Sequence, residues 1–122
     1  MERILIVDDS KTSRKFLKNM LIGAGFEVVA EAIDGIDGIE KYEEFKPEVV
    51  TMDITMPNLD GIDAVTEIMR IDPEAKIIMV TAAGQKNNVV EALKRGAVDF
   101  VQKPFDAEVI VEVIKKAMEE DV

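Results

Sequence analysis

Short apolar runs alternate with longer amphipathic segments along the chain. A short run at 99–102 predicts the last strand, and three others, at 4–7, 49–52 and 77–80, are continuous and rich in β-branched residues. Runs of this kind are typical of strands that are covered on both faces. A fifth run, Glu27–Ala32, is half polar and therefore suits a strand near the edge of a sheet.

The segments that follow these runs carry apolar residues at helical spacing. Glycine or proline lies at or near the end of several of them and favours helix termination there. The spacing predicts five helices, which include residues 16–24, 36–42, 62–69, 89–93 and 110–117.

Five strand-helix cycles predict an α/β fold, in which a parallel sheet is covered by helices on both faces. Right-handed crossovers leave few topologies for such a chain. The first, third and fourth strands are the most apolar and should be central. We therefore expect the flavodoxin-like, doubly wound (βα)5 arrangement with strand order 2-1-3-4-5. The chain has no linker or low-complexity stretch, so residues 1–122 are expected to form a single domain.

Composition narrows the function classes. The 122 residues contain 15 Lys+Arg and 25 Asp+Glu, a net charge of −10, which argues against nucleic acid or an anionic membrane as a partner. The chain has no His and no Cys, which excludes imidazole or thiolate catalysis, disulfides and His/Cys zinc sites. No apolar run is long enough to span a bilayer or serve as a signal peptide, so we expect a cytoplasmic protein.

Polar residues follow four of the five strands. Asp8 and Asp9 follow the first, Asp53 ends the third, Thr81 ends the fourth and Lys103 follows the fifth. Because ligands of open parallel sheets bind at the carboxyl ends of the strands, we expect these side chains to share one rim.

Three carboxylates that lie close together repel one another unless a cation neutralises them. Mg²⁺ suits an all-oxygen set of this kind, and a lysine and a hydroxyl beside it would suit a phosphoryl group. Each residue alone has a simpler interpretation, as a solvated turn, a helix cap or a surface lysine. Their coincidence at four strand ends favours a functional site.

The chain resembles response-regulator receiver domains from Arg3 to about Met118. The resemblance is carried by Ile6–Ser10, by Met52–Pro57 with Asp60-Gly61, by Val80–Ala82, and by Gly96–Phe100 with Lys103-Pro104-Phe105. Within this family the chain is most similar to single-domain chemotaxis regulators, chiefly those with Phe at the switch position.

The resemblance implies a role for each residue at the rim. Asp53 would be the phosphoacceptor, and Mg²⁺ would be held by Asp8, Asp9, Asp53 and the backbone carbonyl of Thr55. Lys103 would pair with the phosphoryl oxygens, and Thr81 would move inward to bond them. Phe100 would follow Thr81 as the second switch residue. The Lys103-Pro104 bond would be cis.

Two positions set this chain apart within the family. Phe100 stands where chemotaxis regulators of the enteric type carry Tyr, so it offers no hydroxyl for readout. Ala83 is small and apolar, and in the family this position and that of Thr55 influence how water reaches the phosphate. We therefore expect self-hydrolysis that is slow for the family.

These expectations describe a phosphorylation switch, active as a monomer, with no catalysis beyond its own phosphotransfer and dephosphorylation. Its partners would be a histidine kinase, which supplies the phosphohistidine that this chain lacks, and a downstream target protein or a phosphatase. Signalling would use protein contact, on the face of the fourth helix, fifth strand and fifth helix.

Other functions remain open from the sequence. A phosphorelay intermediate or another stand-alone receiver would need the same residues. A Mg²⁺-dependent phosphohydrolase with an Asp nucleophile would normally need an Asp-x-Asp loop after the first strand, and an FMN-binding flavodoxin would need a hydroxyl- and Gly-rich loop there. A degenerate receiver, which only binds partners, would lack some of the site residues, whereas the acidic pair, Asp53, Thr81 and Lys103 are all present here.

Overall fold

The computed structural model describes residues 2–119 and has the predicted (βα)5 order. The strands are β1 (Arg3–Val7), β2 (Glu27–Ala32), β3 (Val49–Asp53), β4 (Ile77–Thr81) and β5 (Asp99–Gln102). The helices are α1 (Lys11–Gly23), α2 (Gly35–Phe45), α3 (Gly61–Ile71), α4 (Lys86–Lys94) and α5 (Ala107–Glu119). Each element overlaps its predicted range.

All neighbouring strands are parallel, and their order is β2-β1-β3-β4-β5. The predicted fold class and strand order are therefore confirmed. The half-polar β2 lies at an edge and the apolar β1, β3 and β4 are inside, because only a strand with helices on both faces needs to be apolar throughout.

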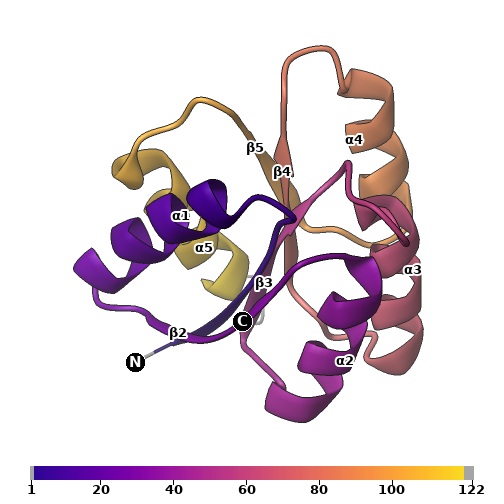
Figure 1. The fold of residues 1–122 in the computed structure, drawn as a ribbon, viewed down its shortest axis with the longest axis horizontal. Coiled ribbons are helices and arrows are strands. Elements are labelled where there is room, and N and C mark those ends of the chain that lie inside the picture. Colours follow the sequence, from indigo (N-terminus) through magenta and orange to yellow (C-terminus); the bar gives the residue numbers. More distant parts are fainter. Residues whose placement is uncertain (1, 120–122) are drawn as a thin grey trace.

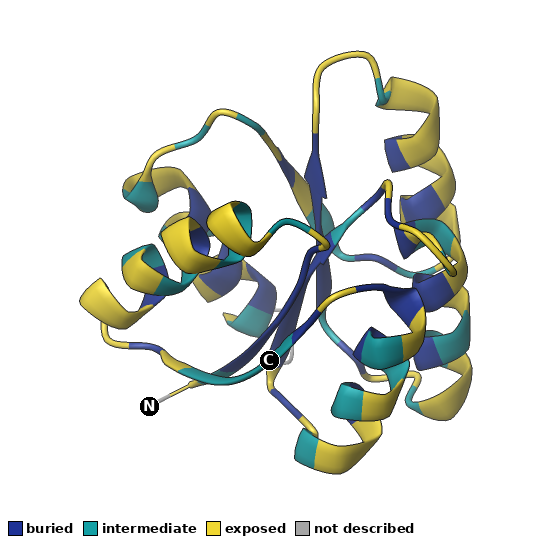
Figure 2. Ribbon diagram, viewed as in Figure 1, coloured by how far each residue is buried: buried dark blue, intermediate teal, exposed yellow. Residues whose placement is uncertain are grey.

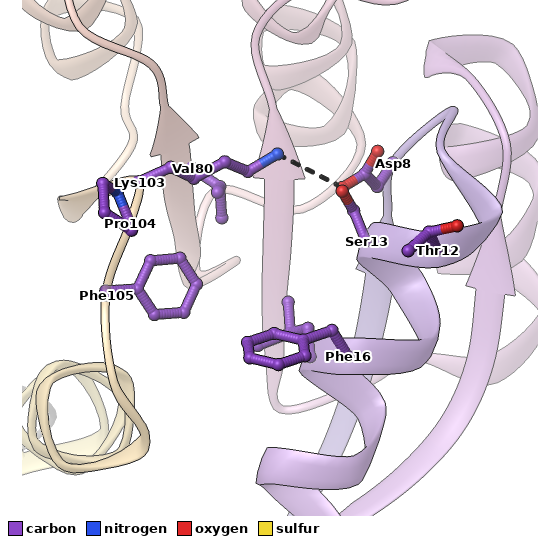
Figure 3. Close-up of a pocket in the computed structure, with 9 residues that line it drawn as sticks. Asp8, Thr12, Ser13, Phe16, Val80, Lys103, Pro104 and Phe105 are labelled. Atoms are coloured by element: carbon purple, nitrogen blue, oxygen red, sulfur yellow. Dashed lines mark ion pairs between the residues drawn. The ribbon is translucent and has the colours of Figure 1, made fainter.

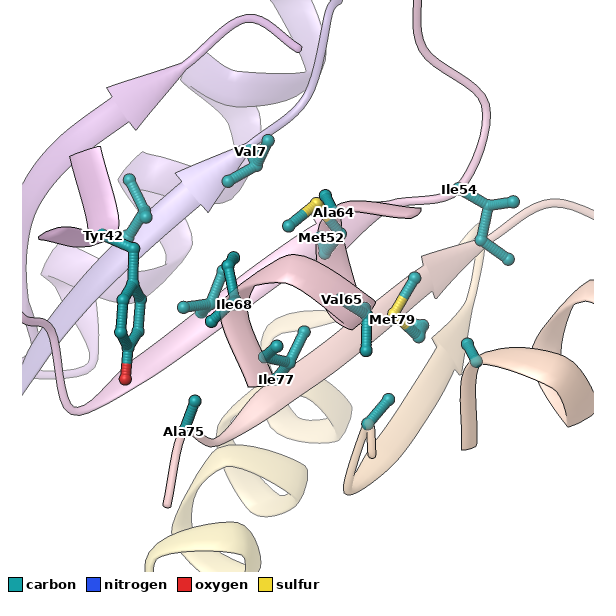
Figure 4. Packing of buried hydrophobic residues seen from close by; sticks show 14 of the residues in the cluster. Val7, Tyr42, Met52, Ile54, Ala64, Val65, Ile68, Ala75, Ile77 and Met79 are labelled. Atoms are coloured by element: carbon teal, nitrogen blue, oxygen red, sulfur yellow. The ribbon is translucent and has the colours of Figure 1, made fainter. Parts of the chain in front are cut away.

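Helices cover both faces of the sheet. In Figure 1, α1 and α5 lie on one side and α2, α3 and α4 on the other. Successive residues of each inner strand point to opposite faces, so Leu5 and Val7 pack toward α2 and α3 while Ile4 and Ile6 pack toward α1 and α5. Figure 4 shows the first of these clusters, in which Val65 and Ile68 of α3 lie against Met52 and Ile77 of the sheet.

Three large apolar side chains of the predicted helical stripes, Phe16, Ile36 and Leu93, lie exposed and outside the core. Phe16 of α1 is 63% exposed, because the adjacent Leu17 and Leu21 one turn later form the buried stripe. Ile36 of α2 is also exposed, since it lies in the first turn, where the helix begins at the rim of the sheet. Figure 2 shows how burial varies over the rest of the fold: the strands are buried inside, and the outer faces of the helices are exposed.

The parallel strands place five loops at one end of the sheet. Their residues follow β1 to β5, and the register of β3 and β4 puts Asp53 opposite Val80 and hence close to Thr81. Within residues 2–119, every helix is too short or too polar to span a lipid bilayer.

Candidate functional site

Three carboxylates meet at the carboxyl end of the sheet. Asp8 and Asp9 follow β1, Asp53 ends β3, and one oxygen from each lies within 4.8 Å of the others. Asp8 is buried, Asp53 is partly buried and Asp9 is exposed. The structure therefore brings together the three residues that the sequence assigned to a metal site.

Backbone contacts fix the loop that carries Asp8 and Asp9. The Asp8 N–H donates to the Ala32 carbonyl of β2 at 3.0 Å, and the Asp8 carboxylate accepts from the Ser10 N–H at 2.8 Å. The Arg14 guanidinium donates to the Asp8 carbonyl at 2.8 Å and pairs with Glu31 at 3.3 Å. This role of Arg14 could not be predicted from the sequence, because an arginine in a first helical turn is ordinarily a surface residue.

The protonation of Asp53 is set by its surroundings. Burial raises the pKa of the Asp53 carboxyl from 3.8 to about 6, and the carboxylates of Asp8 and Asp9 act in the same direction. Lys103 and the hydrogen bond from the Ile54 N–H, at 3.0 Å, oppose this rise in pKa. The ionised carboxylate is thus held in a place where a cation would stabilise it.

Lys103 supplies one positive charge to this rim. Its ammonium Nζ lies 3.7 Å from the Asp8 carboxylate, and Figure 3 shows the Lys103 side chain extending toward Asp8. The Lys103 N–H donates to the Thr81 carbonyl at 2.7 Å, and the Lys103-Pro104 peptide bond is cis, as predicted.

An apolar hollow of about 350 Å³ lies beside Lys103, between α1 and the loop that precedes α5; Figure 3 shows the side chains around it. It is lined by side chains that include Phe16, Val80 and Phe105.

The two predicted switch residues adopt distinct environments. Thr81 is buried, and its hydroxyl donates to the Val101 carbonyl of β5 at 3.4 Å. Its hydrogen bond is therefore directed toward β5 and not toward the carboxylates. Phe100 is 42% exposed on β5, so the apolar ring lies in contact with solvent.

The loop after β3 is held by contacts that the sequence did not reveal. The Asn58 side-chain amide donates to the Asp34 carboxylate at 2.7 Å, and the Gly35 N–H donates to the Leu59 carbonyl at 2.9 Å. A Cβ on Gly61 would overlap the Asp53 carbonyl oxygen, so only glycine fits where α3 begins. These contacts connect distant loops and leave no periodic signal in the sequence.

Thr55 and Ala83 lie exposed in the loops after β3 and β4. The Thr55 hydroxyl accepts a hydrogen bond at 3.0 Å from the side-chain amide of Gln85, a residue that belongs to none of the motifs seen in the sequence. The side chain at position 83 is a methyl group, so it brings neither a charge nor a hydrogen-bonding group to this rim.

The donor set fits magnesium. Carboxylate and carbonyl oxygens are the ligands that this ion prefers, and it uses few protein carboxylates while keeping several waters. Asp8, Asp9 and Asp53 offer three carboxylates within reach of one another. The one positive charge of Lys103 does not balance three ionised carboxylates.

Residues 4–115 match the family described as the response regulator receiver domain. The chain is 53% identical to the chemotaxis protein CheY of Thermotoga maritima over 115 residues, which cover 94% of this chain and 96% of that protein. The crystal structure of the response regulator domain of Thermotoga maritima CheB aligns with a TM-score of 0.90 at 40% identity, over 98% of this chain and 97% of that one.

A third similar structure is a chain in the crystal structure of the CheX-CheY-BeF3-Mg²⁺ complex from Borrelia burgdorferi. It aligns with a TM-score of 0.87 at 36% identity, over 99% of this chain and 90% of that one.

The raised pKa of Asp53 predicts that its negative charge destabilises the folded protein, to an extent that depends on pH. The folded-state pKa of about 6 lies above the ordinary 3.8, so between these two pH values the folded protein binds more protons than the unfolded chain. The free energy of unfolding therefore falls as pH rises through this range. We expect Asp53→Asn to raise the free energy of unfolding by roughly 1–2 kcal/mol at pH 7.5 without metal, a range that allows for solvent screening of the partly exposed carboxylate.

Urea unfolding in EDTA at pH 7.5 and pH 4 measures this gain, which should shrink toward zero at the lower pH. Glu40→Gln, which neutralises an exposed carboxylate on α2, is the control and should change little. An Asp53→Asn protein no more stable than wild type at pH 7.5 would show that the carboxylate carries no such penalty.

Proposed function

The chain belongs to the response regulator receiver domain family, and we propose that it is a two-component switch whose phosphoacceptor is Asp53. The observation that carries this proposal is the convergence of three carboxylate oxygens within 4.8 Å of one another, with the Lys103 ammonium 3.7 Å from one of the three residues. An ordinary surface turn gains nothing from carboxylates held this close together, because they repel one another.

Asp53 is suited to act as a nucleophile because its carboxylate is partly desolvated and keeps one oxygen free of the Ile54 N–H. In the proposed step an oxygen of Asp53 forms a bond to phosphorus while the phosphorus–nitrogen bond of a partner's phosphohistidine breaks. The bonding electrons remain on the imidazole, which takes up a proton. The product on this chain is an acyl phosphate.

Other residues would stabilise the transferred group. Asp8, Asp9, Asp53 and the Thr55 carbonyl would hold Mg²⁺, which would neutralise charge on the phosphoryl oxygens. Lys103 is placed to form an ion pair with those oxygens, because its ammonium already lies beside the acidic cluster. Thr81 would donate its hydroxyl once it leaves the Val101 carbonyl.

We propose that this change of partner is the switch. The hydrogen bond from Thr81 to Val101 is long, at 3.4 Å, whereas a phosphoryl oxygen is a stronger, charged acceptor. Movement of Thr81 would shift the population between two arrangements of the rim. Phe100, now exposed on the adjacent strand, would turn inward with it.

The proposed readout is contact with a target protein through α4, β5 and α5. This face carries exposed apolar side chains, namely Val90, Leu93, Phe100 and Val109.

We propose a chemotaxis pathway, which is supported by 53% identity over nearly the whole length of a CheY protein. A histidine kinase would be the phosphodonor, a phosphatase would be a further partner, and the protein would act as a cytoplasmic monomer in which residues 1–122 form one receiver domain.

Incubation with acetyl phosphate and Mg²⁺ tests the phosphoacceptor. Intact-mass measurement should show one phosphoryl adduct on the wild-type protein and none on Asp53→Asn or in the presence of EDTA. Asp63→Asn removes an exposed carboxylate on α3 and should be labelled like wild type. A wild-type protein that takes up no phosphoryl group would contradict the proposed function.

The lifetime of the adduct tests the role proposed for Ala83. With only a methyl group at this exposed rim position, no side-chain carboxylate orients an attacking water, so hydrolysis should be slow for the family. Ala83→Glu should shorten the lifetime several-fold, measured as loss of the adduct after the phosphodonor is removed. Equal lifetimes in the two proteins would remove the argument.

A further inference from the structure

Gln85 precedes α4 but does not act as its cap. This position favours Ser, Thr, Asp or Asn, whose side chains accept a hydrogen bond from the first helical turn. Among residues 2–119, the Gln85 side chain accepts none from that turn. Gly84, at a φ of +87°, folds the chain back before the helix and leaves the longer Gln85 side chain turned toward the rim.

The carboxamide of Gln85 connects two loops of the site. Its oxygen accepts from the Ala82 N–H at 2.6 Å, and its nitrogen donates to the Thr55 hydroxyl at 3.0 Å. Ala82 follows Thr81 directly, and Thr55 lies two residues after Asp53. Gln85 therefore bridges the chain just beyond the proposed phosphoacceptor and just beyond the proposed switch threonine.

This bridge occupies a backbone donor at the rim where a phosphoryl group on Asp53 would lie. An acyl phosphate on Asp53 brings three acceptor oxygens and additional negative charge to the rim. Asp53 lies opposite Val80 in the register of β3 and β4. Because β4 ends at Thr81, the N–H of Ala82 is the first backbone donor of the loop that follows, and it lies close to Asp53 in the sheet register. In the unphosphorylated structure the Gln85 oxygen already occupies it.

We propose that Gln85 is a positioning residue that acts as a latch across these two loops. Its carboxamide holds the Ala82 N–H and the Thr55 hydroxyl while Asp53 is free, and it is displaced when a phosphoryl group arrives. The latch opposes phosphorylation by the free energy of its hydrogen bonds. This inference rests on the proposed function of Asp53.

Two substitutions with opposite expected effects test the latch. Gln85→Met keeps the side-chain length and removes both hydrogen bonds, so phosphorylation by acetyl phosphate should become roughly three- to tenfold faster, as expected for loss of one or two neutral hydrogen bonds. Gln85→Glu keeps an acceptor for the Ala82 N–H, as a stronger charged bond, and adds negative charge beside three carboxylates. It should react several-fold more slowly than wild type.

Asn88→Met is the matched control, because it replaces an exposed carboxamide in α4 by the same side chain. It should react like wild type. A purely structural role of Gln85 would change the rates of Gln85→Met and Gln85→Glu in the same direction, which would overturn the latch.

A second measurement needs neither Mg²⁺ nor a phosphodonor. In the NMR spectrum of the wild-type protein, the short hydrogen bond should shift the Ala82 amide proton downfield. That shift should be lost in Gln85→Met and retained in Gln85→Glu and Asn88→Met. An Ala82 resonance that does not change in Gln85→Met would show that the bridge is not formed in solution and would overturn the proposal.

Failure of the proposed function and failure of the latch give different results. A wild-type protein that is never labelled overturns the proposed function and the latch with it. Labelling of the wild-type protein with unchanged rates in both Gln85 variants overturns the latch alone.

Discussion

Electrostatic repulsion among the carboxylates of Asp8, Asp9 and Asp53 is the constraint on which the rest of this site depends. Their oxygens lie within 4.8 Å of one another, and the raised pKa of Asp53 reflects burial together with this crowding. A folded chain retains such an arrangement only if its scaffold is rigid enough to oppose the repulsion. The same unfavourable charge is what makes the rim attractive to a divalent cation and, through it, to a phosphoryl group.

The scaffold is rigid because the strands that deliver these residues are buried on both faces. Two apolar layers, one under α2, α3 and α4 and one under α1 and α5, enclose β1, β3 and β4. Beyond the strand ends, fixed hydrogen bonds continue the support: Arg14 holds the Asp8 carbonyl, and Asn58 holds the Asp34 carboxylate. The two residues proposed to change partners, Thr81 and Gln85, lie at the end of β4 and in the loop that follows it, where the chain leaves the sheet.

The sequence predicted the parts of this structure that follow from periodicity. Continuous apolar runs located the inner strands, the half-polar Glu27–Ala32 run located an edge, and parallel topology then required Asp8 and Asp53 to share one end of the sheet. Residues whose role depends on side-chain direction could not be predicted in this way. The hydroxyl of Thr81 is directed toward Val101, Phe16 faces outward, and Gln85 reaches back over a glycine turn. Each depends on a rotamer or a loop geometry that leaves no repeat in the chain.

A crystal structure of the protein with Mg²⁺ and beryllofluoride, a stable mimic of an acyl phosphate, would show the proposed phosphoryl site itself. We expect beryllium bound to an Asp53 oxygen, magnesium held by the acidic cluster and the Thr55 carbonyl, and the Lys103 ammonium and Thr81 hydroxyl directed at the fluorides. Beryllofluoride bound to another carboxylate, or a magnesium ion held away from Asp8, Asp9 and Asp53, would contradict this expectation.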